Sequence, residues 1–187
     1  MSRISKTKII LIGFMASGKS VVAKKLAKKL KMPVIDTDTL IENEQEMKIK
    51  DIFRVHGELF FRKLEKEILK KILSLKRFKA IISTGGGIVL NPENRRILRK
   101  CGIVFYLKSS PEVVLKRVSK DKIDERPLLA GKTNTKDEIK RLLKVRERYY
   151  RACAHYTIDT SGMKIREVVN KITGILKKSP VLLEKKC

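Results

Sequence analysis

Short apolar runs alternate along the chain with longer stretches in which apolar residues recur every three or four positions. Short runs are typical of buried strands, and the wider spacing is typical of helices with one buried face. The alternation predicts repeated strand–helix–strand units. It therefore indicates an α/β fold with three layers, in which helices cover both faces of a central, mostly parallel five-stranded sheet. The expected strands cover residues 8–12, 34–35, 80–84, 103–107 and 156–159.

The helical spacing recurs in seven segments. They cover residues 19–31, 39–46, 57–75, 92–100, 111–119, 136–154 and 165–177. The polar segment 121–135 contains Arg126-Pro127 and Gly131, which predicts a loop, and we expect it to act as a mobile lid. Residues 1–178 are expected to form a single domain with its core at 8–177, followed by a disordered tail at 179–187.

Composition narrows the class of protein. The 187 residues are 42% hydrophobic and 35% charged, which favours a folded globular protein. No apolar run approaches the roughly 18 residues of a membrane span, and the N-terminus lacks the pattern of a signal peptide. The three cysteines are widely spaced, which favours reduced thiols over a disulfide framework or a zinc site. We expect a cytoplasmic monomer with no membrane partner.

The charge balance is extreme. The chain has 45 Lys and Arg against 20 Asp and Glu, a net charge of +25. Such a charge can indicate nucleic-acid binding, or a solvated surface that attracts small anions. The basic residues are scattered along the expected helices, and aromatic residues make up only 5%. We therefore do not expect nucleic acid to be a partner.

One segment carries a strong functional signal. Residues 13–20 read GFMASGKS, which matches GxxxxGK[ST] between an expected strand and an expected helix. Glycines allow backbone N–H groups to surround phosphates, and the helix N-terminus adds further donors. Lys19 is expected to reach the β- and γ-phosphates, and Ser20 to bind Mg²⁺. The expected ATP-binding residues here are Gly13, Ala16, Ser17, Gly18, Lys19, Ser20 and Val21.

A nucleotide site does not by itself define the reaction. The chain lacks the NKxD sequence of guanine-binding switches and the long insertions of motor ATPases. A compact chain with a basic loop that could exclude water is typical of a small-molecule kinase.

Two aspartates follow the second expected strand. Asp36 and Asp38 are one residue apart, and on an extended segment their side chains would point the same way. One could support Mg²⁺ while the other faces an acceptor hydroxyl, because ligands bind at the carboxyl ends of parallel strands. The alternative is a polar turn in which one aspartate caps the next helix.

Two further features come from the middle of the chain. Arg62 and Glu65 are three residues apart on an expected helix, which alone indicates no more than a surface ion pair. Gly85, Gly86 and Gly87 follow an expected buried strand, where each glycine costs about 0.5–1 kcal/mol relative to alanine. We expect this triglycine to let the backbone approach a ligand.

The motifs GFMASGKS, DTD, FFRKLE, STGGG and ERPLLAG occur in this order, followed by an Arg-rich helix. In order and spacing the chain resembles the shikimate kinases over residues 8–177. The resemblance implies a P-loop fold of the nucleoside-monophosphate-kinase type. It also implies transfer of the γ-phosphoryl group of ATP, with Mg²⁺, to the 3-hydroxyl of shikimate, a step of chorismate and aromatic amino acid biosynthesis.

The resemblance also implies residue roles. Asp38 would be the base, Asp36 would support Mg²⁺, and Lys19 and Arg126 would act on the transferred phosphoryl group. Arg62 and Arg146 would bind the carboxylate, with Glu65 orienting Arg62. The remaining implied residues are Phe53, Phe61, Gly85, Gly86 and Gly87 in the shikimate pocket and Arg117 at the adenine, with 159–161 as the adenine-side loop.

The sequence departs from the family pattern at three places. Ala16 replaces a common glycine, which is tolerable if its φ is negative. The segment after Arg146 is altered, which leaves Arg148 as the alternative for the carboxylate site. Ser83 stands where many P-loop enzymes have a strand-end aspartate, which makes Asp36 more important for the metal.

Three other functions are weighed against this reading. They are a kinase of another hydroxy acid such as gluconate, a P-loop protein that binds nucleic acid, and an inactive regulatory relative. The triglycine with two arginines favours shikimate, and the presence of Lys19, Asp38 and Arg126 argues against an inactive relative.

Overall fold

The computed structural model describes residues 8–75, 78–118, 127–130 and 133–178. Five strands form one sheet in the order β2-β3-β1-β4-β5, and every pairing is parallel. The strands are β1 (Lys8–Ile12), β2 (Val34–Asp36), β3 (Ala80–Ser83), β4 (Gly102–Lys108) and β5 (Tyr156–Asp159). The expected α/β fold class is confirmed.

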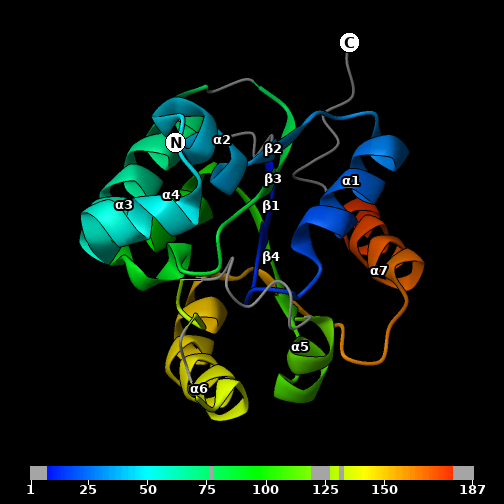
Figure 1. The fold of residues 1–187 in the computed structure, drawn as a ribbon. Coiled ribbons are helices and arrows are strands. Elements are labelled where there is room, and N and C mark those ends of the chain that lie inside the picture. The colour runs from blue at the N-terminus through cyan, green and yellow to red at the C-terminus, as the bar shows by residue number, and fades with distance from the viewer. Residues whose placement is uncertain (1–7, 76–77, 119–126, 131–132, 179–187) are drawn as a thin grey trace.

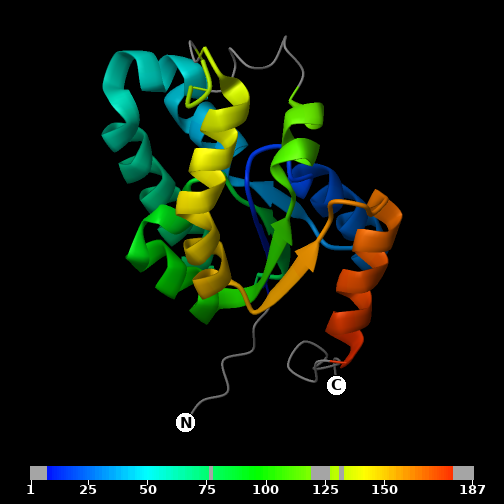
Figure 2. The ribbon, with the colours of Figure 1, turned by 90° about the horizontal axis from the view of Figure 1, so that it is seen from below.

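Helices cover both faces of this sheet (Figures 1 and 2). On one face lie α1 (Lys19–Leu30) and α7 (Ile165–Lys178). The other face carries α2 (Thr37–Gln45), α3 (Ile49–Ser74), the 3-10 helix η1 (Ile88–Leu90), α4 (Pro92–Cys101), α5 (Pro111–Arg117) and α6 (Thr135–Cys153). None of the described helices is both long and apolar enough to span a membrane.

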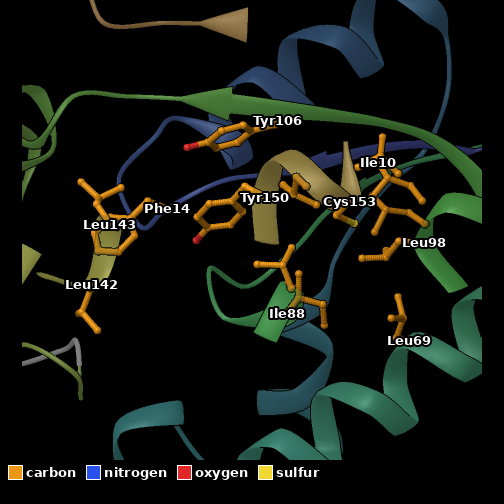
Figure 3. Packing of buried hydrophobic residues seen from close by; sticks show 14 of the residues in the cluster. Ile10, Phe14, Leu69, Ile88, Leu98, Tyr106, Leu142, Leu143, Tyr150 and Cys153 are labelled. Atoms are coloured by element: carbon orange, nitrogen blue, oxygen red, sulfur yellow. The ribbon is translucent and has the colours of Figure 1, made fainter. Parts of the chain in front are cut away.

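The alternation of side chains along β1 divides the core into two clusters. Ile9 and Leu11 pack with α1 and α7, whereas Ile10 and Ile12 pack with the helices of the opposite face. Both sets are buried, so the strand reads as an unbroken apolar run, as expected for a central parallel strand. Figure 3 shows part of the larger cluster.

Two helices begin earlier than expected. Helix α2 begins at Thr37 rather than at residue 39, because the Asp36 side chain accepts a hydrogen bond from the Asp38 N–H and caps the helix. Helix α3 begins at Ile49, whereas the sequence analysis placed its start at 57. At Gly57 the backbone leaves helical geometry, with φ 78° and ψ 173°, and the helix kinks there.

The connections place a crevice at the carboxyl end of the sheet. Strand β1 lies between β3 and β4, while the chain passes from β1 to β2 on one side and from β3 across to β4 on the other. Ligands of open α/β sheets bind where the connections diverge in this way. The loops after β1, β2 and β3 therefore determine the chemistry.

Candidate active site

The phosphate loop follows β1 and closes on itself through its own backbone. Gly13 has φ 153°, and a Cβ atom there would lie 2.6 Å from the carbonyl oxygen of Leu107. Only glycine fits this close approach. The Lys19 Nζ donates hydrogen bonds to the carbonyl oxygens of Gly13 and Phe14, at 2.9 and 2.8 Å. The loop thus holds an almost buried ammonium group at the N-terminus of α1.

Ala16 does not meet the condition under which an alanine would be tolerable at its position, a negative φ. Its φ is 57°, in the left-handed region. In that region the Cβ atom crowds the following carbonyl oxygen, at a cost of about 1–2 kcal/mol for a residue other than glycine. The chain therefore carries backbone strain at the centre of its phosphate loop.

Side-chain oxygens of three residues meet beside this loop. The Ser20 hydroxyl donates to a carboxylate oxygen of Asp36 at 3.0 Å, and it lies 3.3 Å from the Ser83 hydroxyl. Mg²⁺ prefers oxygen ligands, and it is usually bound through one or two carboxylates together with phosphates and water. These residues fit that donor set. No cluster of three or more His, Cys, Asp or Glu side chains suited to a metal occurs in the described part of the chain.

The two aspartates do not lie on an extended segment, so the argument from strand alternation is wrong. Asp36 ends β2 and caps α2, while Asp38 lies in the first turn of that helix. The capping alternative holds for Asp36, which nevertheless also contacts Ser20.

A cavity of about 630 Å³ opens over the phosphate loop. It is lined by both aspartates and by six of the expected nucleotide residues, one of which is Arg117. The Arg117 Nη1 donates to the Ala16 carbonyl oxygen at 3.3 Å. Gly13 and Ser17 belong to the loop but do not line the cavity. The five loop residues that do are Ala16, Gly18, Lys19, Ser20 and Val21.

A second cavity, of about 460 Å³, lies next to the first. It is lined by every residue that the family resemblance assigned to the shikimate pocket, and these residues come from four different parts of the chain. These residues are Asp38, Phe53, Phe61, Arg62, Glu65, Gly85, Gly86, Gly87 and Arg146. The two cavities share Met15, Asp38 and Gly86, so they meet at the ends of β1, β2 and β3.

The triglycine gives space to protein side chains. A Cβ atom at Gly85 would lie 2.6 Å from a carboxylate oxygen of Asp38 and 2.8 Å from one of Glu65. At Gly87 it would lie 2.1 Å from the Arg62 guanidinium. Each side chain can reach the cavity only because the β3–η1 turn has no Cβ atoms there. The close approach expected for a ligand is thus made first by the chain's own charged groups.

The cavity holds two arginines in different settings. Arg62 donates to Glu58 and Glu65. Burial lowers the pKa of Arg62, but the charges and hydrogen bonds of Glu65 and Glu58 together raise it above its usual value. Arg146 is 3% exposed and lies over the ring of Phe14, with 5.8 Å between the guanidinium carbon and the ring centre. By contrast, Arg148 is exposed and donates to the Tyr149 hydroxyl. The structure places Arg146, not Arg148, in the cavity.

Asp38 and Glu65 are both buried carboxyl groups of the site whose pKa values are raised, in each case chiefly by burial. Burial and, to a smaller extent, repulsion by Asp36 and Glu65 raise the pKa of Asp38 to about 7, although Lys19 and Arg62 oppose the rise. One oxygen of Asp38 and one of Glu65 are buried without a hydrogen-bond partner in the described structure. Buried acceptors of this kind are costly unless a donor satisfies them. The cavity is therefore suited to a ligand with hydroxyl groups.

Sequence reasoning missed several lining residues. Lys48, Ile49 and Lys50 line the acceptor cavity. They were missed because the first part of α3 was not expected from the sequence. At the nucleotide cavity, residues 163–165 line the wall, whereas 159–161 do not. Residues 163–165 could have been found from the sequence, since they lie at the start of α7, after the carboxyl end of β5. The further missed residues are Met15, Glu42, Pro127 and Leu128 at the acceptor and Thr84 at the nucleotide.

The proposed lid falls mainly outside the described residues. Arg126 lies outside the described residues, so its position is not assigned. The next residues, Pro127 and Leu128, line the acceptor cavity, and Leu129 is buried in the core. Residues 127–129 thus lie beside the cavity or in the adjoining core.

Known proteins with similar sequences and folds agree with this arrangement. A family model described as shikimate kinase matches residues 15–177. The shikimate kinase of Thermoanaerobacter pseudethanolicus is 46% identical, and that of Caldanaerobacter subterraneus subsp. tengcongensis is 48% identical. Each match spans 164 residues, which are 88% of this chain and 92% of the relative.

Solved structures give the same result. The shikimate kinase from Acinetobacter baumannii in complex with shikimate has a TM-score of 0.86 and 35% identity, covering 94% of this chain and 95% of that chain. The shikimate kinase from Aquifex aeolicus has a TM-score of 0.75 and 34% identity, covering 91% and 96%. With the family model, close relatives and fold in agreement, this chain belongs to the shikimate kinase family.

Proposed function

We propose that the chain transfers the γ-phosphoryl group of ATP to the 3-hydroxyl of shikimate, giving shikimate 3-phosphate and ADP. The observation that carries the proposal is the junction of the two cavities at Asp38 and Gly86. A phosphate-binding loop there adjoins a pocket with two arginines and two unpaired carboxylate oxygens. Shikimate has a carboxylate and three hydroxyl groups, which match these charges and acceptors.

Arg62 and Arg146 would bind the shikimate carboxylate. A guanidinium group can donate two parallel hydrogen bonds to a carboxylate, which fixes its orientation as well as its position. Arg62 is held by Glu58 and Glu65 in the structure, so its fork is already oriented. Phe53 and Phe61, whose ring centres are 4.8 Å apart, would form the apolar wall.

Lys19 and the loop N–H groups would bind the phosphates of ATP, and Arg117 would lie beside the adenine. Members of this family use ATP as the phosphoryl donor. We propose that Ser20 and Asp36 hold Mg²⁺, which would neutralise phosphate charge. Arg126 remains a predicted lid residue that stabilises the transferred group.

Asp38 would accept the proton of the acceptor hydroxyl. As the bond between the 3-oxygen and the γ-phosphorus forms, the bond from that phosphorus to the bridging oxygen of ADP breaks. The proton passes to the Asp38 carboxylate, whose pKa of about 7 suits a base at neutral pH. Because the transition state is loose, positioning and charge stabilisation supply most of the catalysis.

We further propose that this reaction serves chorismate and aromatic amino acid biosynthesis in the cytoplasm, that the protein acts as a monomer, and that residues 1–178 form one domain with a lid near 121–135. These proposals rest on the family and on the sequence.

A panel of acceptors tests the function. ADP release is measured with ATP and Mg²⁺ alone, then with shikimate, with shikimate methyl ester and with gluconate. We expect release with shikimate, at least about tenfold weaker kcat/KM with the ester because a charged partner is lost, and only background otherwise. Higher activity with gluconate would contradict the proposal, as would ADP release that depends on added RNA or DNA.

A further inference from the structure

Tyr150 connects the two sides of the acceptor cavity. It is fully buried on α6, four residues after Arg146, so the two side chains share one face of the helix. Its hydroxyl donates to the carbonyl oxygen of Gly86 at 2.5 Å, and the charge of the nearby Arg146 opposes the rise that burial causes in the pKa of the same hydroxyl. The Tyr150 hydroxyl thus ties helix α6, which also carries Arg146, to the triglycine after β3.

Gly86 lies at the boundary between the two cavities. A Cβ atom there would lie 3.2 Å from the Met15 backbone nitrogen and 3.5 Å from the Gly13 carbonyl oxygen, so this glycine packs against the phosphate loop. The order of contacts is therefore phosphate loop, Gly86, Tyr150 and Arg146. A shift at any of them would change the distance between the phosphate site and the carboxylate site.

We propose that Tyr150 is a positioning residue, which holds Arg146 and the Gly86 backbone at a fixed distance from the phosphate loop so that the acceptor is aligned for transfer. The inference rests on the proposed function. Tyr150 does not line either cavity and need not touch a substrate. Misplacement of about 1 Å can cost about a hundredfold in rate, which gives such a residue a measurable role.

The neighbouring Tyr106 offers a matched control. Figure 3 shows the rings of Tyr106 and Tyr150 one above the other, and their centres are 4.8 Å apart with 16° between the planes. Tyr106 is also buried, and its hydroxyl donates to Glu147 of α6 at 2.7 Å. It therefore makes a similar bond to the same helix, but among the described residues no hydrogen bond joins its hydroxyl to the triglycine.

The test compares Tyr150→Phe with Tyr106→Phe in a full kinetic assay. Each change removes one oxygen atom and keeps the stacked rings, and the melting temperature reports any loss of stability. For Tyr150→Phe we expect the KM for shikimate to rise about tenfold, which corresponds to one hydrogen bond, with the KM for ATP within about twofold. For Tyr106→Phe both KM values should stay within about twofold.

A double-mutant cycle shows whether Tyr150 acts through Arg146. If it does, Tyr150→Phe should have a smaller effect in the Arg146→Lys background than in the wild type. Equal shikimate KM values for the two tyrosine variants would overturn the inference while leaving the proposed function intact. Strictly additive effects would remove Arg146 from it. A wild-type protein that does not phosphorylate shikimate would overturn both proposals.

Discussion

At the scale of single residues, Ala16 shows how a family site can carry local strain. Its positive φ lies within a loop whose backbone must face phosphates, so the conformation is set by the loop and not by the alanine. Gly18, in the same loop, has φ 93° and meets the same demand with a residue that tolerates it.

Ala16→Gly should therefore raise the free energy of unfolding. Release of the left-handed strain outweighs the greater freedom of glycine in the unfolded chain, for a net gain of about 0.5–1 kcal/mol. Chemical denaturation measures the change. Ala23→Gly is the control, since Ala23 is buried within α1 and its loss should lower stability by about 1 kcal/mol. An Ala16→Gly protein that is less stable than the wild type would contradict the claim that the backbone is strained at Ala16.

Arg146 and Arg148 can be separated by substitution. Arg146→Ala should raise the KM for shikimate about 10–100-fold, as expected for the loss of charged hydrogen bonds, and leave the KM for ATP nearly unchanged. Arg148→Ala removes an exposed cation of the same helix and should change neither constant by more than about twofold. The opposite pattern would show that the altered segment after Arg146 had shifted the carboxylate site.

Asp38 links the site to stability. Between pH 3.8 and about 7 the folded state keeps a proton that the unfolded state releases, so this group makes the protein less stable as the pH rises through that interval. Asp38→Asn abolishes this dependence. Without nucleotide or metal, the variant should match the wild type near pH 4 and exceed it by up to about 4 kcal/mol at pH 8.

Thermal or denaturant unfolding across this pH range measures the difference. Asp51→Asn serves as the control, because Asp51 forms only a surface pair with Arg54 on α3, worth less than about 1 kcal/mol. An Asp38→Asn advantage that is equal at pH 4 and pH 8 would mean that the raised pKa is absent.

At the scale of elements, the sequence predicted the strands more accurately than the helices, because each strand is a compact apolar run. Every strand lies within one residue of its expected bounds at either end, since each is a short apolar run followed by turn residues. The first part of α3 was missed because Gly57 interrupts the helical pattern, and periodicity cannot distinguish a kink from a helix start. The start of α2 was missed because a cap at Asp36 is a matter of side-chain geometry.

The kink at Gly57 positions part of the acceptor cavity. With φ 78° and ψ 173°, the backbone is in a region open almost only to glycine, although a Cβ atom there would meet no atom within 4 Å. The segment before it carries Phe53, which lines the cavity.

Gly57→Ala should therefore lower the free energy of unfolding by about 1–3 kcal/mol through backbone strain alone. The shift of Phe53 should also raise the KM for shikimate, with less effect on the KM for ATP. Gly174→Ala, in α7 and equally open, is the control, and it should be neutral or slightly stabilising. Unchanged stability in Gly57→Ala would mean that α3 can straighten at residue 57 without loss, which would contradict the proposed need for glycine there.

At the scale of the whole molecule, the sequence brought together the right residues without giving their contacts. All the residues expected in the shikimate pocket line one cavity, because order along the chain and the carboxyl ends of parallel strands fix which loops meet. It could not decide which aspartate caps α2, and it could not give the packing of Arg62 over Gly87 or the bond from Tyr150 to Gly86. These depend on distances between segments far apart in the chain.

The central claim is that a phosphate site and a carboxylate site face each other across the ends of β1, β2 and β3. A crystal structure of the protein with shikimate, ADP and Mg²⁺ tests it most directly. The account predicts the shikimate carboxylate between Arg62 and Arg146, with the 3-hydroxyl within about 3 Å of Asp38 and directed towards the phosphate loop. Shikimate bound outside this cavity, or turned so that its carboxylate faces Lys19, would contradict it.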